Sequence, residues 1–304
     1  MGTAGIILRQ IVVMFIYMAI GWLLFKKKLV TKEGSGSLAN VLLSAVMPCV
    51  ILNSFSGVSS PEKNRTVLLS ILGAALALAL SMVLAHLVYR KDPVADFGSA
   101  FSNAGFMGIP LVAAAFGSQS VIYVSGMMAF LLVLQWTYGQ SLLAGNWNEL
   151  ALKKIAANPL VIAFVIGMAV YFGRVPLPGI IKDCLSSMAA LNAPLAMIIL
   201  GTYLAEVSFR EIFTSRRLWA VSLYRGFAIP LATMALLLLV FPRNRDMASM
   251  LLISASAPVG ANVAVFAKKQ GKDYQYACKL VCLSTLLSAV TMPAVMLLWN
   301  TVAV

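Results

Sequence analysis

Two apolar segments of this chain, 97–117 and 247–267, contain residues that a membrane-spanning helix rarely holds. The interrupting residues are Asn103, Gly105, Gly108 and Pro110 in the first segment and Pro258, Gly260 and Asn262 in the second. Glycine permits backbone angles that a Cβ would forbid, and proline removes a helical N–H donor. A freed backbone group costs several kcal/mol in hydrocarbon, so such a break persists only where it lines a protein or water cavity.

The matched pair of breaks predicts a binding site. Two Gly/Pro-interrupted spans at corresponding positions of two halves are typical of a secondary transporter's substrate site. The second half of each broken helix would begin with partial positive charge and face an anionic group, with Asn103 and Asn262 beside the gap. The alternative is a packing kink, because Gly and Pro are common in spanning helices. Ser254 and Ser256 could contribute, or could bond the preceding helical turn.

Charged side chains inside apolar segments are costly and indicate function. Arg225 lies deep in segment 218–241, where it could pair with a substrate carboxylate or neutralise a helix C-terminus. His86 could be a proton site or an interfacial histidine. The carboxylates, Asp96 among them, are expected outside the spans or at their ends, which argues against a proton antiporter built on buried aspartates. The surplus of positive charge favours an anionic substrate.

The composition excludes a water-soluble fold. The chain is 61% hydrophobic and 11% charged, with a mean hydropathy of +0.92, whereas soluble domains average about 25% charged residues. The net charge of +13 comes from Lys and Arg in the gaps between apolar runs, which indicates membrane topology rather than binding to nucleic acid. Four cysteines without a CxxC pair and a single histidine predict neither a metal site, a cofactor nor a disulfide framework.

Apolar runs of about 20 residues predict an all-α polytopic membrane protein with ten transmembrane helices. The runs are 4–25, 37–57, 66–89, 97–117, 120–144, 159–173, 186–205, 218–241, 247–267 and 274–300. Five lie in residues 1–145 and five in residues 146–304, and an odd number per half gives the halves opposite orientations. If the halves are homologous, they form two inverted five-helix repeats.

The internal repeat can be aligned in two registers. Pro48 in the second span corresponds to Pro194 in the seventh. In the fourth and ninth spans, residues 108–110 can lie on residues 260–262, or residues 102–103 on residues 258–259. The sequence leaves both registers open.

The loops also predict the orientation in the membrane. The run 4–25 has spanning length and is followed by Lys26, Lys27 and Lys28, which is typical of a first span rather than a cleaved signal peptide. The positive-inside rule places this cluster inside and both chain termini outside.

Several motifs together resemble the auxin efflux carrier family of membrane transporters, in its bacterial branch, over essentially the whole chain. The motifs are Gly21 to Gly34, Ser102-Asn103 with Gly108-Ile-Pro110-Leu, Asn158-Pro-Leu160, Pro176-Leu-Pro178, Pro194 leading to Leu200-Gly201, and Pro258-x-Gly260 running into Val265-Phe-Ala-Lys268. The plant carriers have a proline where this chain has Ser102, and they carry a long central loop that this chain lacks. Both differences argue against plant-type auxin specificity.

The resemblance implies a scaffold built from spans 1, 2, 6 and 7 and a transport domain built from spans 3–5 and 8–10. It also implies that the broken helices 4 and 9 cross within the transport domain, which slides as an elevator, usually in a homodimer. The implied substrates are small carboxylates such as malate or malonate, or auxin-like acids, carried across the bacterial inner membrane. Coupling to Na⁺ or H⁺ is left open.

Two other function classes are weighed against a carrier of organic anions. A channel, or a uniporter driven by the membrane potential, could share the same fold. An intramembrane enzyme is disfavoured because His86 has no Gly-x-Ser-x-Gly partner and no aspartates cluster to bind Mg²⁺.

Overall fold

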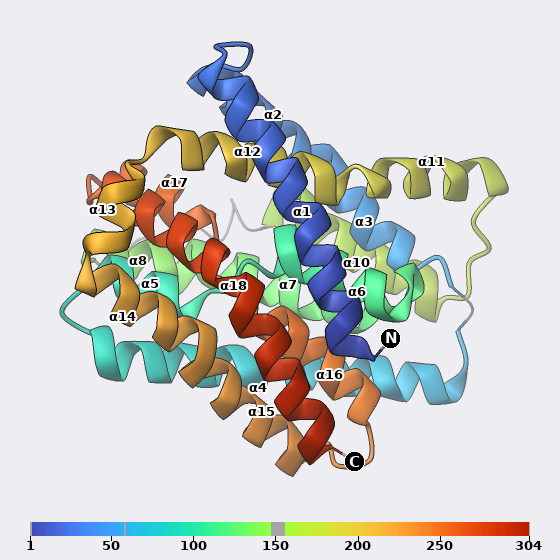
Figure 1. Ribbon diagram of the computed structural model, residues 1–304. Helices are drawn as coiled ribbons and strands as arrows, with labels where there is room; N and C mark the ends of the chain where they lie inside the picture. The colour runs from blue at the N-terminus through green and yellow to red at the C-terminus, as the bar shows by residue number, and fades with distance from the viewer. Residues whose placement is uncertain (1, 58, 147–155, 304) are drawn as a thin grey trace.

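The computed structural model describes residues 2–57, 59–146 and 156–303 (Figure 1). The secondary structure of these residues is helical, and their single extended pairing is an isolated antiparallel bridge between Ser102 and Val259. The predicted boundary between the halves, at 145/146, lies beside residues 147–155, which fall outside the described residues. The all-α class is confirmed.

Seven helical stretches of the described chain are long and apolar enough to cross a membrane. They are α1 (Thr3–Lys26), α2–η1–α3 (Lys32–Val41, Leu42–Val46, Met47–Ser54), α4 (Pro61–Tyr89), η3–α7–η4–α8 (Ser118–Val121, Ile122–Leu134, Gln135–Gly139, Gln140–Ala144), α11–α12 (Gly179–Ala190, Asn192–Glu206), α14–η5–α15 (Arg216–Leu223, Tyr224–Ala228, Ile229–Val240) and α18 (Tyr274–Val302). An eighth apolar helix, α10 (Pro159–Phe172), has 14 residues. The short α13 (Phe209–Thr214) joins α12 to α14. A multi-pass membrane protein follows, while the count of ten spans stays a prediction.

The two segments with interrupting residues are each broken into two helices. The first consists of α5 (Pro93–Ala100) and, after three non-helical residues, η2 (Ala104–Gly108) with α6 (Ile109–Phe116). The second consists of α16 (Arg245–Ala255) and α17 (Asn262–Lys269). The second break contains Pro258 and Gly260, whereas the first lies at residues 101–103, before Gly105, Gly108 and Pro110, which are themselves helical.

Prolines also explain three of the four π-helical segments in the described part of the chain, all except η4 (Gln135–Gly139). The π segments η1, η2 and η5 end two residues before Pro48, Pro110 and Pro230, respectively. A proline ring clashes with the carbonyl four residues earlier and offers no N–H to it. The preceding turn therefore widens to i→i+5 hydrogen bonds.

Close glycine contacts hold α1 against α12. A Cβ on Gly21 would lie 2.1 Å from the carbonyl oxygen of Ile198, and one on Gly201 would lie 2.0 Å from that of Met18. Small residues are what allow helices to approach this closely in membranes. Elsewhere α3 packs against α10 and α11, α4 packs against α5 and α7, and α18 packs against α14 and α17. The helices of spans 1, 2, 6 and 7 are thus neighbours, as are those of spans 3–5 and 8–10.

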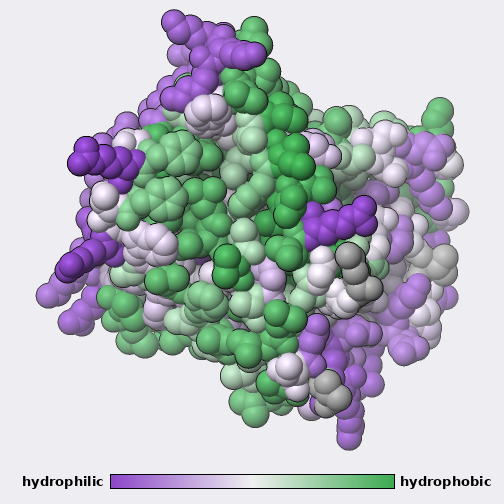
Figure 2. Space-filling model, in the orientation of Figure 1, coloured by the Kyte–Doolittle hydropathy of each residue, from purple (hydrophilic) through white to green (hydrophobic). Residues whose placement is uncertain are grey.

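Basic residues gather at one end of the bundle. Ion pairs join Lys32 to Glu206, Arg217 to Asp92, and Lys279 to Glu211. Lys268 lies over the ring of Tyr274, as does Lys32. Because α1 ends and α18 begins at this end, both termini lie toward the opposite one (Figure 1). Figure 2 shows an apolar middle on the face that carries α1 and α18, with hydrophilic side chains around its edges.

Candidate functional site

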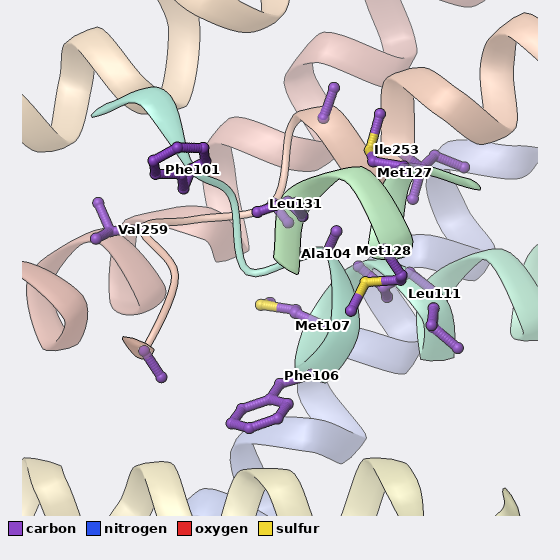
Figure 3. Packing of buried hydrophobic residues seen from close by; sticks show 14 of the residues in the cluster. Phe101, Ala104, Phe106, Met107, Leu111, Met127, Met128, Leu131, Ile253 and Val259 are labelled. Atoms are coloured by element: carbon purple, nitrogen blue, oxygen red, sulfur yellow. The ribbon is translucent and has the colours of Figure 1, made fainter. Parts of the chain in front are cut away.

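The two unwound segments cross and bond to each other. The backbone N–H of Asn103 donates to the carbonyl of Pro258 at 2.7 Å, and that of Gly260 donates to the carbonyl of Phe101 at 3.0 Å. Ser102 therefore lies opposite Val259, and Figure 3 shows Phe101 and Val259 on the two crossing segments. Each broken helix thus satisfies backbone groups that the other has freed, which is how irregular backbone survives at membrane depth.

Glycines permit the close approach at this crossover. A Cβ on Gly260 would lie 3.2 Å from the carbonyl oxygens of both Phe101 and Ser102. A Cβ on Gly108 would lie 3.0 Å from the Cα of Ser254. These neighbours are mostly backbone atoms, which cannot rotate away as a flexible side chain can, so a side chain at either position would push the segments apart.

Arg225 holds the ends of the first half-helices. Its side chain is 1% exposed. Its Nε donates to the carbonyl of Ala257 at 3.2 Å, and its Nη1 donates to that of Ser99 at 3.1 Å. Its Nη2 donates to the carbonyl of Ala255. These carbonyls belong to the C-terminal ends of α5 and α16 and to the residues just beyond, where helices carry partial negative charge. The geometry therefore supports the structural one of the two roles open for Arg225.

A cavity lies beside the crossover. Its lining comes from η1, α3, η2, α7, η4, α10 and both crossing segments: Leu43, Met47, Ser102, Asn103, Gly105, Phe106, Met128, Leu131, Leu132, Gln135, Leu160, Gly260, Ala261 and Asn262. The space is about 40 Å³, well below the ~150 Å³ of an engineered cavity that accommodates benzene. The cavity must therefore widen before it can hold a small organic acid.

Polar groups of the cavity come from four lining side chains. The amide Nδ2 of Asn262 donates to Oε1 of Gln135 at 2.8 Å. The Nδ2 of Asn103 and the hydroxyl of Ser102 are buried without a hydrogen-bond partner in the structure. Unsatisfied buried donors are uncommon and costly. The lining contains no acidic side chain, so the cavity presents hydrogen-bond donors without negative charge.

The N-terminal and C-terminal helix ends at the crossover have different surroundings. The second half-helices begin at Ala104 and Asn262, beside the cavity lining. Gly105, Phe106, Ala261 and Asn262, at or beside these first turns, line the cavity, so the partial positive charge of both helix N-termini lies next to it. The negative C-terminal ends of α5 and α16 are held by Arg225 instead. Such a cavity is suited to bind an anion.

A second cavity lies on the other side of α6. It is about 380 Å³ and is lined by Gln10, Val50, Asn53, Ile109, Pro110, Ala113, Ala114, Ser118, Val121, Ser186, Ala189, Ala190, Asn192 and Ala193. The Nδ2 of Asn192 donates to the carbonyl of Gly105 at 3.2 Å. Gly105 lines the first cavity and Asn192 the second, so this hydrogen bond lies in the wall between them.

The structure brings together only part of the predicted site. Asn103, Gly105, Gly260 and Asn262 line the first cavity, whereas Pro110 lines the second. Gly108 and Pro258 belong to the crossover without lining either cavity. Pro48 and Pro194 lie in α3 and α12, outside both linings.

Sequence reasoning missed three residues. Gln135 and Asn192 are uncharged amides within apolar spans, and that isolated polarity was the only signal available. Asp96 was expected outside the spans or at a span end. It does lie in the first turn of α5, but its side chain is fully buried against His86. Among the described residues, no three His, Cys, Asp or Glu side chains cluster as a metal site.

The chain is similar in sequence to known membrane transporters. The sequence pattern of a family described as "Membrane transport protein" matches residues 6–150 and 145–296. The chain is 25% identical over 313 residues to an "Uncharacterized transporter" of Methanothermobacter thermautotrophicus, covering 99% of both chains. It is 21% identical over 288 residues to a "Putative malonate transporter" of Rhizobium meliloti, covering 88% of this chain and 87% of the relative.

Proposed function

Because the chain belongs to the membrane transport protein family, we propose that it is a secondary active transporter of small organic anions. The family match confirms the resemblance inferred from the motifs. The proposed substrates are carboxylates of the size of malonate or malate. The name of the Rhizobium relative supports this class.

One observation carries the proposal. The first turns of two half-helices line one cavity together with Asn103, whose Nδ2 has no hydrogen-bond partner in the structure. A carboxylate accepts several hydrogen bonds and is stabilised by N–H groups at a helix N-terminus. Because Arg225 is occupied by main-chain carbonyls, the attraction for the anion comes from the backbone and the amides.

The position of the cavity supports an elevator mechanism. Leu43, Met47 and Leu160 come from spans assigned to the scaffold, whereas the crossover and Gln135 come from spans assigned to the transport domain. Substrate binds to the polar wall and moves with it along the apolar wall. Alternating access then requires the crossover to slide as one body, and the bonds between its segments keep it intact.

The wider proposal has ten spans in two inverted repeats, both termini outside, and a homodimer in the bacterial inner membrane. Ser102 pairs with Val259 in the antiparallel bridge, whereas one of the two repeat alignments matches Ser102 with Pro258. The two matches differ by one position. Coupling to Na⁺ or H⁺ belongs to the same proposal.

The test combines binding and transport of carboxylates. We expect purified protein to be stabilised by one or more mono- or dicarboxylates, by about 2.7 kcal/mol at a hundredfold excess over Kd. The same acids should show saturable uptake and counterflow in proteoliposomes. Counterflow separates a carrier from a channel, because a channel equilibrates its solute without exchange.

The variant Asn103→Ala tests the site itself. We expect it to insert and fold normally while losing carboxylate binding and counterflow, because a free donor of the cavity is removed. Asn40→Ala, at an exposed position of α2, is the matched control. Unchanged transport kinetics in Asn103→Ala would contradict the site, and stabilisation only by neutral or cationic compounds would contradict the anion class.

A further inference from the structure

A second polar centre lies on α5, outside the cavity. The side chain of Asp96 is fully buried, and its Oδ2 lies 2.8 Å from Nδ1 of His86 on α4. Its other oxygen, Oδ1, is buried without a hydrogen-bond partner in the structure. Among the described residues, this is the one carboxylate with a side chain that is completely removed from solvent.

The histidine of this pair reaches the surface. The His86 side chain is 50% exposed and lies in an apolar groove of about 600 Å³ between α4 and the α7–η4 helix. Its position near the C-terminal end of α4 places it toward the basic end of the bundle. The imidazole therefore connects the buried carboxylate with the outside of the protein.

The other charged or titratable groups near Asp96 on neighbouring helices do not form an ion pair with it. Asp92 on the same helix is bound to Arg217 of α14 and accepts a hydrogen bond from Tyr276 of α18 at 3.4 Å. Tyr138 of η4 lines the same groove as His86. Arg225 of η5 binds the carbonyl of Ser99 on α5. Of the described cationic or protonatable bases, His86 alone forms an ion-pair contact with Asp96.

Protonation changes the net charge of this pair. With neutral imidazole and ionised carboxylate the pair carries one negative charge, which is costly to bury. A proton taken up at the imidazole converts it into a neutral ion pair. Histidine is suited to this exchange because its unperturbed pKa, about 6.5, lies near physiological pH.

We propose that Asp96 and His86 form a proton-binding site that couples anion transport to the proton gradient. The inference rests on the proposed function. One proton from the aqueous phase adds to His86 on one side of the membrane and leaves to water on the other. No bond other than N–H is made or broken. Because α4 and α5 both belong to the assigned transport domain, the proton moves with the substrate site in symport.

The single histidine of the chain allows a direct test. With [¹³C,¹⁵N]histidine and a histidine-free purification tag, imidazole NMR reports His86 alone. We expect the Nδ1 signal of His86 to differ between wild type and Asp96→Asn at the same pH, because the contact with Oδ2 of Asp96 is lost. Asp92→Asn, at the N-cap of the same helix, is the matched control, since Asn still caps α5. Identical His86 signals in wild type and Asp96→Asn would overturn the site.

Transport assays test the coupling separately. With the membrane potential clamped at zero, an inward proton gradient of one pH unit should drive about tenfold accumulation for one proton per anion. We expect Asp96→Asn and His86→Gln to lose this accumulation while retaining counterflow at equal pH and stabilisation by the same carboxylate.

The outcomes distinguish the two proposals. Failure of counterflow in the wild type refutes the proposed function. Normal counterflow with gradient-driven accumulation retained in folded Asp96→Asn and His86→Gln refutes the proton site alone. If Asp96→Asn does not fold, His86→Gln decides, because its exposed side chain can be replaced without burying a new group.

Discussion

Replacing Arg225 by lysine tests whether its guanidinium holds the crossover together or binds the anion. Lysine keeps the positive charge but has a single ammonium group in place of a planar fork. The guanidinium donates to three main-chain carbonyls in a buried site. An ammonium placed there would satisfy about one of them.

The magnitude follows from the carbonyls left without a donor. Each unsatisfied buried acceptor costs about 1–3 kcal/mol, so two give about 2–6 kcal/mol of destabilisation. In a chain of this length such a loss lowers the midpoint of thermal unfolding by about 3–9 °C. Because the crossover positions the site, we also expect transport of every substrate to fall by a similar factor.

The assay compares thermal unfolding in detergent with transport of several acids. Arg217→Lys is the control, because Arg217 is an exposed residue paired with Asp92 and exposed pairs contribute at most about 1 kcal/mol. Our reasoning is refuted if Arg225→Lys unfolds at the wild-type temperature and if, relative to wild type, its affinity falls more for dicarboxylates than for monocarboxylates. That pattern would make Arg225 an anion ligand.

Two further variants probe the crossover and the cavity. Gly260→Ala should weaken transport at least tenfold and reduce stability, because the new Cβ lies 3.2 Å from two carbonyl oxygens. The control Gly36→Ala, with open space around its Cβ, should behave as wild type. Normal transport in Gly260→Ala would show that the crossover is not tightly closed. Asn262→Asp should preserve thermal stability, because a negative charge suits the N-terminus of α17 and the Gln135 amide can turn to donate to the new carboxylate in place of the lost bond. It should weaken carboxylate binding at least tenfold by repulsion. Unchanged binding in Asn262→Asp would separate α17 from the site.

The spans could be predicted because they depend on local properties of the chain. A helix in hydrocarbon satisfies its backbone internally, so about 20 apolar residues in a row are enough to predict one. That both segments are interrupted was predictable for a similar reason, since Gly and Pro act on their own backbone. The position was predictable only for the second break, at 256–261, because the first, at 101–103, lies before Gly108 and Pro110. The short α10 was the weakest prediction because it has fewer apolar residues to count.

Side-chain partners were beyond the sequence because they come from residues far apart in the chain. Arg225 could pair with a substrate or a helix end until the structure placed three carbonyls around it. Asp96 lies in the first turn of α5, yet packing against α4 removes its side chain from solvent. The bond between Asn262 and Gln135 joins residues 127 positions apart.

The sequence by itself determined that the chain is a multi-pass membrane protein and that two of its apolar segments are interrupted. Only the tertiary structure decided that the breaks meet, that their positive ends share one cavity, and that their negative ends share Arg225. The physical reason is that hydropathy and backbone freedom belong to single residues and short windows. Charge compensation and cavity shape arise only when distant segments pack together.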